Sequence, residues 1–266
     1  MPGMEDARSR LQWASSRRTT RPEDIAYSLF GIFNLHLPVL YGESAEFSLG
    51  RLLAEVISQS GDISILDWVG EASMFHSCFP ARITSYQTLP VPPSDTEEQS
   101  STASRQPTSS KALRKLYRSP QPRFMNRRLT LSCFSHRVTT VLLKSTDPSS
   151  SSYTYEIHAS GLQPLEITLS EELENTAWSP GEPESATGAL QLVRPLHSKS
   201  LSRSAKLDAA ATEQLLVTLG RPFNALLLTE LPHNEYKRIA SSTLIAAQPV
   251  DSTSILQSKI RTFNIV

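Results

Sequence analysis

Two side chains able to do nucleophilic chemistry lie close together in the segment "FHSC", where His76 precedes Cys78 by two residues. A cysteine thiolate activated by a histidine base is the machinery of one class of hydrolases. In an extended segment, residues two apart point to the same side, which would bring these two groups together. The sequence shows no third group to orient the histidine, and catalytic pairs are defined by geometry rather than by sequence proximity. We therefore expect that the protein is not an enzyme. A small hydrolase that uses His76 and Cys78 is the alternative.

Other catalytic and ligand-binding motifs are missing from the sequence. "GESAEFSLG" lacks the glycine spacing of a G-x-S-x-G nucleophile elbow, and neither a G-x-x-x-x-G-K-[ST] nor a G-x-G-x-x-G phosphate loop occurs. The histidines lack the i, i+3 or i, i+4 spacing of metal ligands on a helix. They are His36, His76, His136, His158, His197 and His233. Cys78 and Cys133 have apolar or hydroxyl neighbours, which predicts buried thiols. We expect no cofactor and no metal.

Residues 1–86 have the apolar spacing of a helical block. In "MEDARSRLQWASSR", apolar residues recur at intervals of three and four and form one stripe of a short helix. These residues are Met4, Ala7, Leu11 and Ala14. A second helix is predicted to begin where Thr20 and Glu23 have capping-box spacing, and Gly31 is positioned to end it.

A third helix is predicted over residues 43–60, with Gly61 ending it and one apolar stripe facing inward. The stripe consists of Leu49, Leu52, Leu53, Val56 and Ile57. If the block packs on a separate partner domain, part of the stripe should be uncovered here, because an amphipathic face needs something to cover it. The next segment, "DISILDW", has the apolar content of a strand.

Residues 87–122 are rich in Pro, Ser and Thr and have few apolar residues, which predicts a linker. In residues 123–266 the apolar period drops to two, as in strands. The predicted strands are "RRLTLSCF", "HRVTTVLLK", "YTYEIHAS", "PLEITLS", "GALQLVRPL", "NALLLTEL", "STLIAAQPV" and "IRTFNIV", and "DAAATEQLLVTLG" is a predicted helix. The predicted fold class is α+β: an N-terminal helical block followed by a mostly antiparallel β-rich region with one helix.

The overall composition is that of a soluble cytoplasmic protein, with 266 residues, 39% hydrophobic residues and zero formal net charge. No apolar run reaches the roughly 18 residues that a membrane-spanning helix requires. The start "MPGMEDARSR" also lacks the apolar core of a secretory signal. We therefore expect a cytoplasmic protein with no membrane partner.

Charge is distributed unevenly along the chain. Residues 99–146 contain ten basic residues and no acid, whereas residues 147–193 contain eight acids and no lysine or arginine. The basic segment could bind phosphates as a nucleic-acid-binding module. However, no recognition helix, zinc finger or RNA-binding aromatic motif accompanies it. Pairing of basic and acidic residues on neighbouring strands is the preferred interpretation, so nucleic acid is an unlikely partner.

The stretch "LQWASSRRTTRPEDIAYSLFGIFNLHLPVLYGE" is the densest motif of the chain. It closely resembles the block that follows the HET domain in fungal heterokaryon-incompatibility proteins, with the pattern W-A-x-x-R-x-T-T-R-x-E-D-x-A-Y-S-L-x-G-I-F and then P-x-L-Y-G-E. The matching residues include Trp13, Arg17, Thr19, Thr20, Arg21, Glu23, Asp24, Tyr27, Gly31, Phe33, Pro38, Tyr41, Gly42 and Glu43. "GDISILDWVGEASMFHSCFPARITSY" and "RPFNALLLTELPHNEYKRIA" more loosely resemble the basidiomycete branch of the family.

The resemblance implies a role in fungal non-self recognition, in which the HET domain triggers programmed cell death. In the family this domain lies upstream of the motif and has a fold related to TIR domains. Trp13 follows Met1 by only twelve residues, so we expect the HET domain to be absent and the chain to be a truncated product or a stand-alone paralogue. The expected function is a non-enzymatic accessory or interaction region that docks on a HET domain or another incompatibility protein.

The same resemblance leaves open whether the motif is an active site or a folding element. We expect it to organise a core, with Arg21, Glu23 and Asp24 at a helix start and with buried rings of Tyr27, Phe30 and Phe33.

Overall fold

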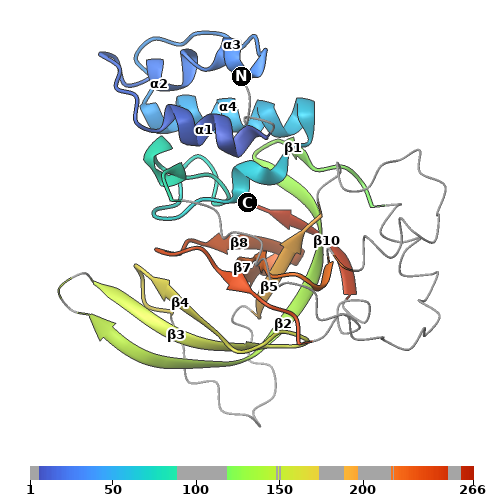
Figure 1. Cartoon of the computed structure of the whole chain (residues 1–266). Helices are drawn as coiled ribbons and strands as arrows, with labels where there is room; N and C mark the ends of the chain where they lie inside the picture. The colour runs from blue at the N-terminus through green and yellow to red at the C-terminus, as the bar shows by residue number, and fades with distance from the viewer. Residues whose placement is uncertain are drawn as a thin grey trace.

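The computed structural model describes residues 6–88, 119–147, 149, 151–173, 189–196, 217, 219–250 and 259–266. Within these ranges the chain is α+β, with few helices and a mixed, mostly antiparallel sheet, which confirms the predicted class at this level. The helices gather on one side of the molecule and the strands on the other (Figure 1). No helix in the described ranges is long and apolar enough to cross a membrane.

The first and third predicted helices are confirmed as α1 (Ala7–Ala14) and α4 (Ala45–Ser60). Asp6 and Ser44 cap them by accepting hydrogen bonds from backbone N–H groups of the first turn. The predicted stripe of α4 is buried, but the expectation that part of it is uncovered is wrong. Its residues share one core cluster with α1 and with strand residues such as Leu131 and Phe263, so the chain itself covers this face.

The prediction of a single second helix is wrong. The chain forms two single turns there, α2 (Asp24–Tyr27) and α3 (Phe30–Phe33). Glu23, rather than Thr20, precedes the first turn, and its side chain makes no cap hydrogen bond there. Gly31 lies inside α3, which ends at Asn34 in the left-handed conformation (φ 53°). Contacts with a later loop, described below, fix these turns.

Residues 62–88 have little regular structure, so the helical block is confirmed only in part. The predicted strand "DISILDW" forms the 3₁₀ turn η1 (Ile63–Leu66), and η2 (Ile83–Tyr86) follows. The Asp62 carboxylate accepts the N–H of Ser64 and so stabilises the turn. All four residues of η1 are buried. A short run that is apolar on every side does not distinguish a strand from a turn by periodicity, which explains the error.

The β-rich region contains one long strand, β2, that pairs with four others. The described strands are β1 (Arg123–Met125), β2 (Arg128–Asp147), β3 (Ser152–Ala159), β4 (Leu165–Leu169), β5 (Leu190–Pro195), β6 (Phe223–Asn224), β7 (Leu226–Leu231), β8 (Glu235–Ile239), β9 (Ala246–Ala247) and β10 (Lys259–Ile265). The two strands predicted over "RRLTLSCF" and "HRVTTVLLK" are the single strand β2. Strand β8, which follows the turn η4 (Pro232–Asn234), has no counterpart among the predicted strands.

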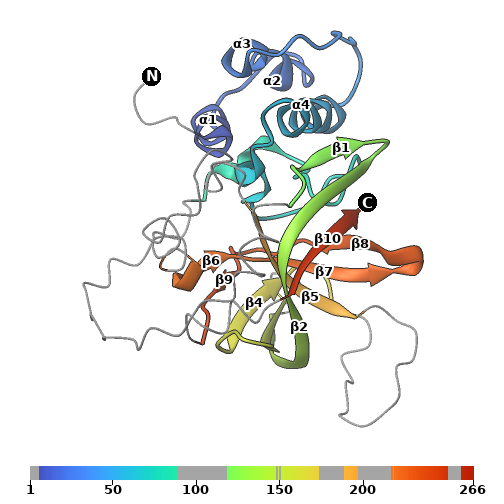
Figure 2. The same cartoon turned by 90° about the vertical axis from the view of Figure 1, so that its right-hand side faces the viewer.

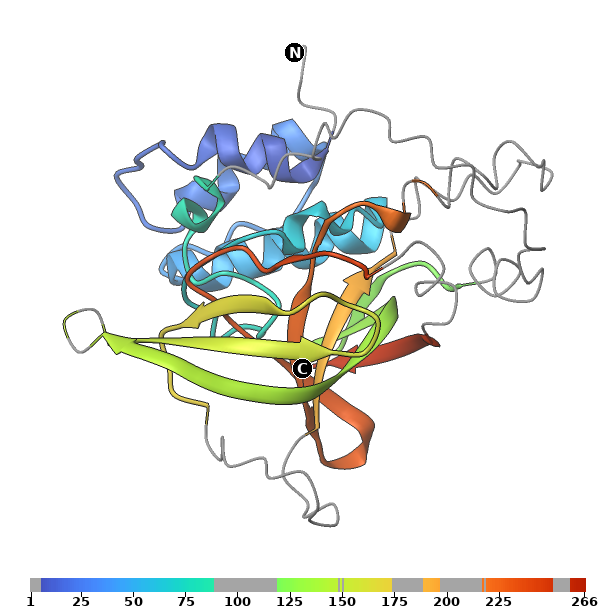
Figure 3. The same cartoon turned by 60° about the horizontal axis from the view of Figure 1, so that its bottom comes forward.

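The main sheet closes on itself through β10. The order is β10-β8-β7-β5-β2-β3-β4, and β10 pairs in parallel with β8 and antiparallel with β2. Beyond this ring, β2 continues as a long hairpin with β3 that extends away from the ring (Figure 3). The linker predicted over 87–122 and the helix predicted over 208–220 lie almost entirely outside the described residues.

Alternate residues of the strands enter two separate cores. In β7, Leu226 and Leu228 pack with the helical block, whereas Leu227 packs in a second cluster with β3 and β4. This explains the continuous apolar run "NALLLTEL", because a strand buried on both faces shows no polar alternation. The helical block therefore rests on one face of the ring, with α4 beside β1 (Figure 2).

Candidate functional site

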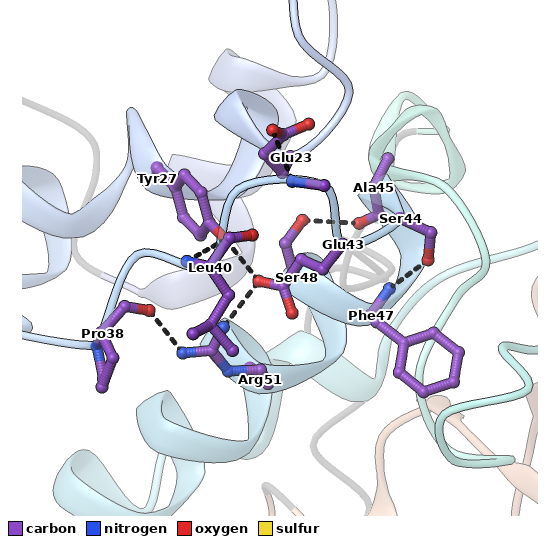
Figure 4. A network of polar contacts seen from close by, with 11 residues as sticks. Glu23, Tyr27, Pro38, Leu40, Glu43, Ser44, Ala45, Phe47, Ser48 and Arg51 are labelled. Atoms are coloured by element: carbon purple, nitrogen blue, oxygen red, sulfur yellow. Dashed lines mark hydrogen bonds and ion pairs between the residues drawn. The ribbon is translucent and has the colours of Figure 1, made fainter.

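The densest sequence motif folds around a loop, residues 34–43, that is held by polar side chains, most of them at least partly buried. The Tyr27 hydroxyl accepts the N–H of Leu40 at 2.9 Å and donates to Glu43 Oε1 at 2.5 Å (Figure 4). Burial, and then the hydrogen bond to Glu43, raise the pKa of Tyr27. The Tyr27 ring also packs against Phe30, with 5.4 Å between ring centres. One side chain of α2 thus fixes both the loop and the start of α4.

Glu23 holds the same loop at a second point. Its carboxylate accepts the N–H of Gly42 at 3.2 Å, and its residue is almost fully buried. Hydrogen bonds from its own backbone N–H and from that of Gly42 lower the pKa of Glu23, with a smaller contribution from Arg21. Gly42 has φ +90°, a conformation that strains residues with a Cβ, so glycine suits this position.

A third connection comes from Arg51 on α4, outside the motif. One Arg51 nitrogen pairs with Glu43 Oε1 at 2.6 Å, and the other donates to the Pro38 carbonyl at 2.6 Å (Figure 4). Both side chains of the ion pair are largely buried. The planar guanidinium spans two acceptors at once, which a lysine ammonium does with much less geometric control. Sequence analysis missed Arg51, since eight residues separate it from Glu43 and no local pattern links them.

A second group of motif residues is exposed. The Arg17 guanidinium lies 3.8 Å from the centre of the Trp13 ring, and the Arg21 guanidinium lies 4.8 Å from that of Tyr41. Trp13 is 40% exposed and Tyr41 is 71% exposed. Trp13 lies near the end of α1, Arg17 and Arg21 lie on the segment between α1 and α2, and Tyr41 lies in the loop before α4. We call these four residues together with exposed Arg18 the arginine–aromatic surface.

The remaining motif residues have mixed roles. Phe33 is half-buried beneath Arg10, which also donates to the Ile32 carbonyl. Asp24 is half-buried at the start of α2, and Thr20 and Gly31 are exposed. Nothing within 4 Å would meet a Cβ at Gly31, and the structure does not explain the glycine there. The motif therefore combines a buried polar network with an exposed surface, and the expected core function describes only its buried part.

The structure does not arrange His76 and Cys78 as a nucleophile and base. His76 Nε2–H donates to the Ile265 carbonyl at 3.0 Å, and Nδ1 accepts the backbone N–H, not the thiol, of Cys78 at 3.1 Å. Burial lowers the pKa of His76 to about 4 and raises the pKa of Cys78 to about 12. Both ring nitrogens are occupied and the thiol stays protonated, so the pair has a structural role that joins the loop to β10. Burial likewise raises the pKa of Cys133, and the predicted burial of both thiols is confirmed.

Several residues of the basic segment bind within the chain. Lys144 on β2 pairs with Glu156 on β3 at 2.7 Å, as expected if the basic and acidic segments face each other. Arg128 forms an ion pair with Glu235, and the Arg127 guanidinium lies 5.3 Å from the centre of a Phe75 ring. Residues 105–118 of this segment lie outside the described ranges. Over the described part of the chain, no group of three His, Cys, Asp or Glu side chains could hold a metal ion.

A comparison with known proteins relates part of the chain to fungal incompatibility. The chain is 49% identical over 57 residues to the vegetative incompatibility protein HET-E-1 of Podospora anserina. This match covers 21% of the chain but only 4% of the length of that protein. No family model matches the chain, and no solved structure matches it.

Proposed function

We propose that the chain is a non-enzymatic accessory or interaction region of a fungal vegetative-incompatibility system. The observation that carries the proposal is the 57-residue similarity to a protein named for vegetative incompatibility. Because the match covers 4% of that protein, it transfers a biological context and no chemistry. The partner we propose is a HET domain or another incompatibility protein.

The arrangement of the motif supports binding more than catalysis. Its ionisable groups Glu23 and Glu43 are used to hold a loop, and His76 has both ring nitrogens bonded to the backbone. By contrast, the rings of Trp13 and Tyr41 are presented to solvent. Aromatic residues on a protein surface are more often used in recognition than in chemistry.

Expression in a fungal strain that lacks other HET proteins tests this proposal. We expect the chain alone to leave growth unchanged, and co-expression with an intact HET protein to change the extent of cell death. Purified chain should also bind a recombinant HET domain in solution and should show no turnover of NAD or activated esters. Cell death caused by the chain alone, or ester turnover that is lost in Cys78→Ala, would overturn the proposal.

A further inference from the structure

We propose that the arginine–aromatic surface binds an acidic segment of a partner protein. This inference rests on the proposed function, because it names the chemistry of the partner that an interaction region would recognise. The proposal starts from the exposed half of the motif, whose side chains contribute little to the core.

The charge of the surface is unbalanced. Arg17, Arg18 and Arg21 are all exposed, and within the described residues the structure gives none of them an ion pair. The nearest acid in sequence, Glu23, accepts the backbone N–H of Gly42 and interacts electrostatically with Arg21, but it forms no ion pair with that residue. A partner that brings carboxylates would therefore complete this charge pattern.

The position of each guanidinium over an aromatic ring prepares it to bind a carboxylate. Arg17 lies over Trp13 and Arg21 over Tyr41, so ring faces restrict both guanidiniums before any partner arrives. A guanidinium placed over a ring face can still direct N–H groups to a carboxylate for paired hydrogen bonds. Such preorganisation reduces the side-chain entropy lost on binding.

The loop that carries Tyr41 is also held by hydrogen bonds at two points. The residues on either side, Leu40 and Gly42, donate their backbone N–H groups to Tyr27 and Glu23. The ring of Tyr41 is 71% exposed, and the backbone on either side of it is held by buried Glu23 and partly buried Tyr27. A fixed, exposed tyrosine beside an arginine is typical of an interface anchor.

The composition favours a protein partner over nucleic acid. The first lysine of the chain is Lys111, so every basic residue of the helical block is an arginine. Protein interfaces are enriched in Arg, Trp and Tyr and depleted in Lys. Exposed Val39 and Leu40 adjoin Tyr41 and would contact apolar side chains of a peptide. The phosphate backbone of a nucleic acid offers no apolar groups for these side chains to contact.

The test compares the wild type with Arg17→Lys/Arg21→Lys, which keeps the charge but removes the planar groups. Fluorescence anisotropy would use labelled short peptide pools in which Asp, Glu, Leu and Tyr are randomised, and a matched pool with Asn and Gln replacing the acids. We expect saturable binding of the acidic pool only, weakened about tenfold in the double variant. Arg82→Lys is the matched control, since Arg82 is an exposed arginine outside the surface. Thermal unfolding would verify that each variant is folded.

Three results would overturn the inference. The first is that the wild type and the double variant bind the acidic pool equally. The second is that the wild type binds a mixed-sequence single-stranded oligonucleotide more tightly than the acidic pool. The third is that the chain self-associates and that the double variant abolishes this self-association. The proposed function fails separately. If the wild type and the double variant bind a HET domain equally, only the role of the arginine–aromatic surface is refuted. If the chain binds the acidic pool but no HET domain, only the identity of the proposed partner is refuted.

Discussion

Acidification should destabilise this protein through His76. The folded pKa is about 4, against 6.5 for an unperturbed histidine, and burial is the main cause. Protonation would also place a hydrogen on Nδ1, where the N–H of Cys78 already points. The unfolded chain therefore binds this proton more readily than the folded chain between these two pH values.

The magnitude follows from the difference between the two pKa values. One pKa unit corresponds to about 1.36 kcal/mol, so the stabilisation that is fully present above pH 6.5 should decrease by about 2 kcal/mol at pH 5 and by about 3 kcal/mol at pH 4. A loss of this size is a large fraction of the stability of an ordinary domain. His136 is also buried with a lowered pKa, and it should add a contribution of the same sign.

Urea unfolding of the wild type and His76→Gln at several pH values between 7 and 4 would measure this effect. The variant should be less stable at pH 7, because it loses the bond to the Ile265 carbonyl, but its stability should fall less steeply with decreasing pH. His36→Gln, at an exposed position, is the control and should retain the wild-type slope. Identical slopes for the wild type and His76→Gln would refute the assignment of acid sensitivity to this buried ring.

Three further substitutions test the packing. Tyr27→Phe should lower stability by about 1.5 kcal/mol and Tm by about 4 °C because it removes the hydrogen bonds to the Leu40 N–H and to the part-buried Glu43 carboxylate, whereas Tyr41→Phe should leave Tm unchanged in the same scan. Gly50→Ala should destabilise by about 1 kcal/mol in urea unfolding, against the usual gain for alanine in a helix, because its Cβ would lie 2.5 Å from Phe75 atoms; higher stability would contradict this contact. Arg238→Met should lower the unfolding free energy by about 2 kcal/mol, since two buried carbonyls lose their donor, and an unchanged midpoint would show that water replaces it.

Local sequence signals predicted the elements that local contacts stabilise. Helix α4 has a capping serine, a clear apolar stripe and Gly61 at its end, so residues within one segment specify it. Turns α2 and α3 differ, because Glu23 and Tyr27 use their polar groups on a loop 13 to 19 residues later. No periodicity within α2 encodes these long-range hydrogen bonds, so a single helix was predicted.

The strands show the same limit. The sequence correctly indicated a mostly antiparallel region, since residues in β3 and β4 alternate between buried ones and partly buried or exposed ones. It did not indicate β8, whose buried polar residue Arg238 donates to the carbonyls of Leu66 and Trp68. A buried arginine that bonds to another segment resembles an exposed one in the sequence. Ring closure by β10 also depends on pairings more than a hundred residues apart.

Family resemblance identified the motif residues, but only the structure separates their roles. Glu23 and Tyr27 bind the backbone on either side of Tyr41 and leave its ring exposed. The backbone beside the exposed ring is held by polar groups that lie 13 to 19 residues earlier in the same motif, so residues that hold the loop and residues that are exposed occur together within it. Substitution of Glu23 or Tyr27 should therefore weaken binding of the partner and destabilise the fold, although neither side chain contacts the partner. Substitution of Tyr41 should weaken binding of the partner and leave the fold intact.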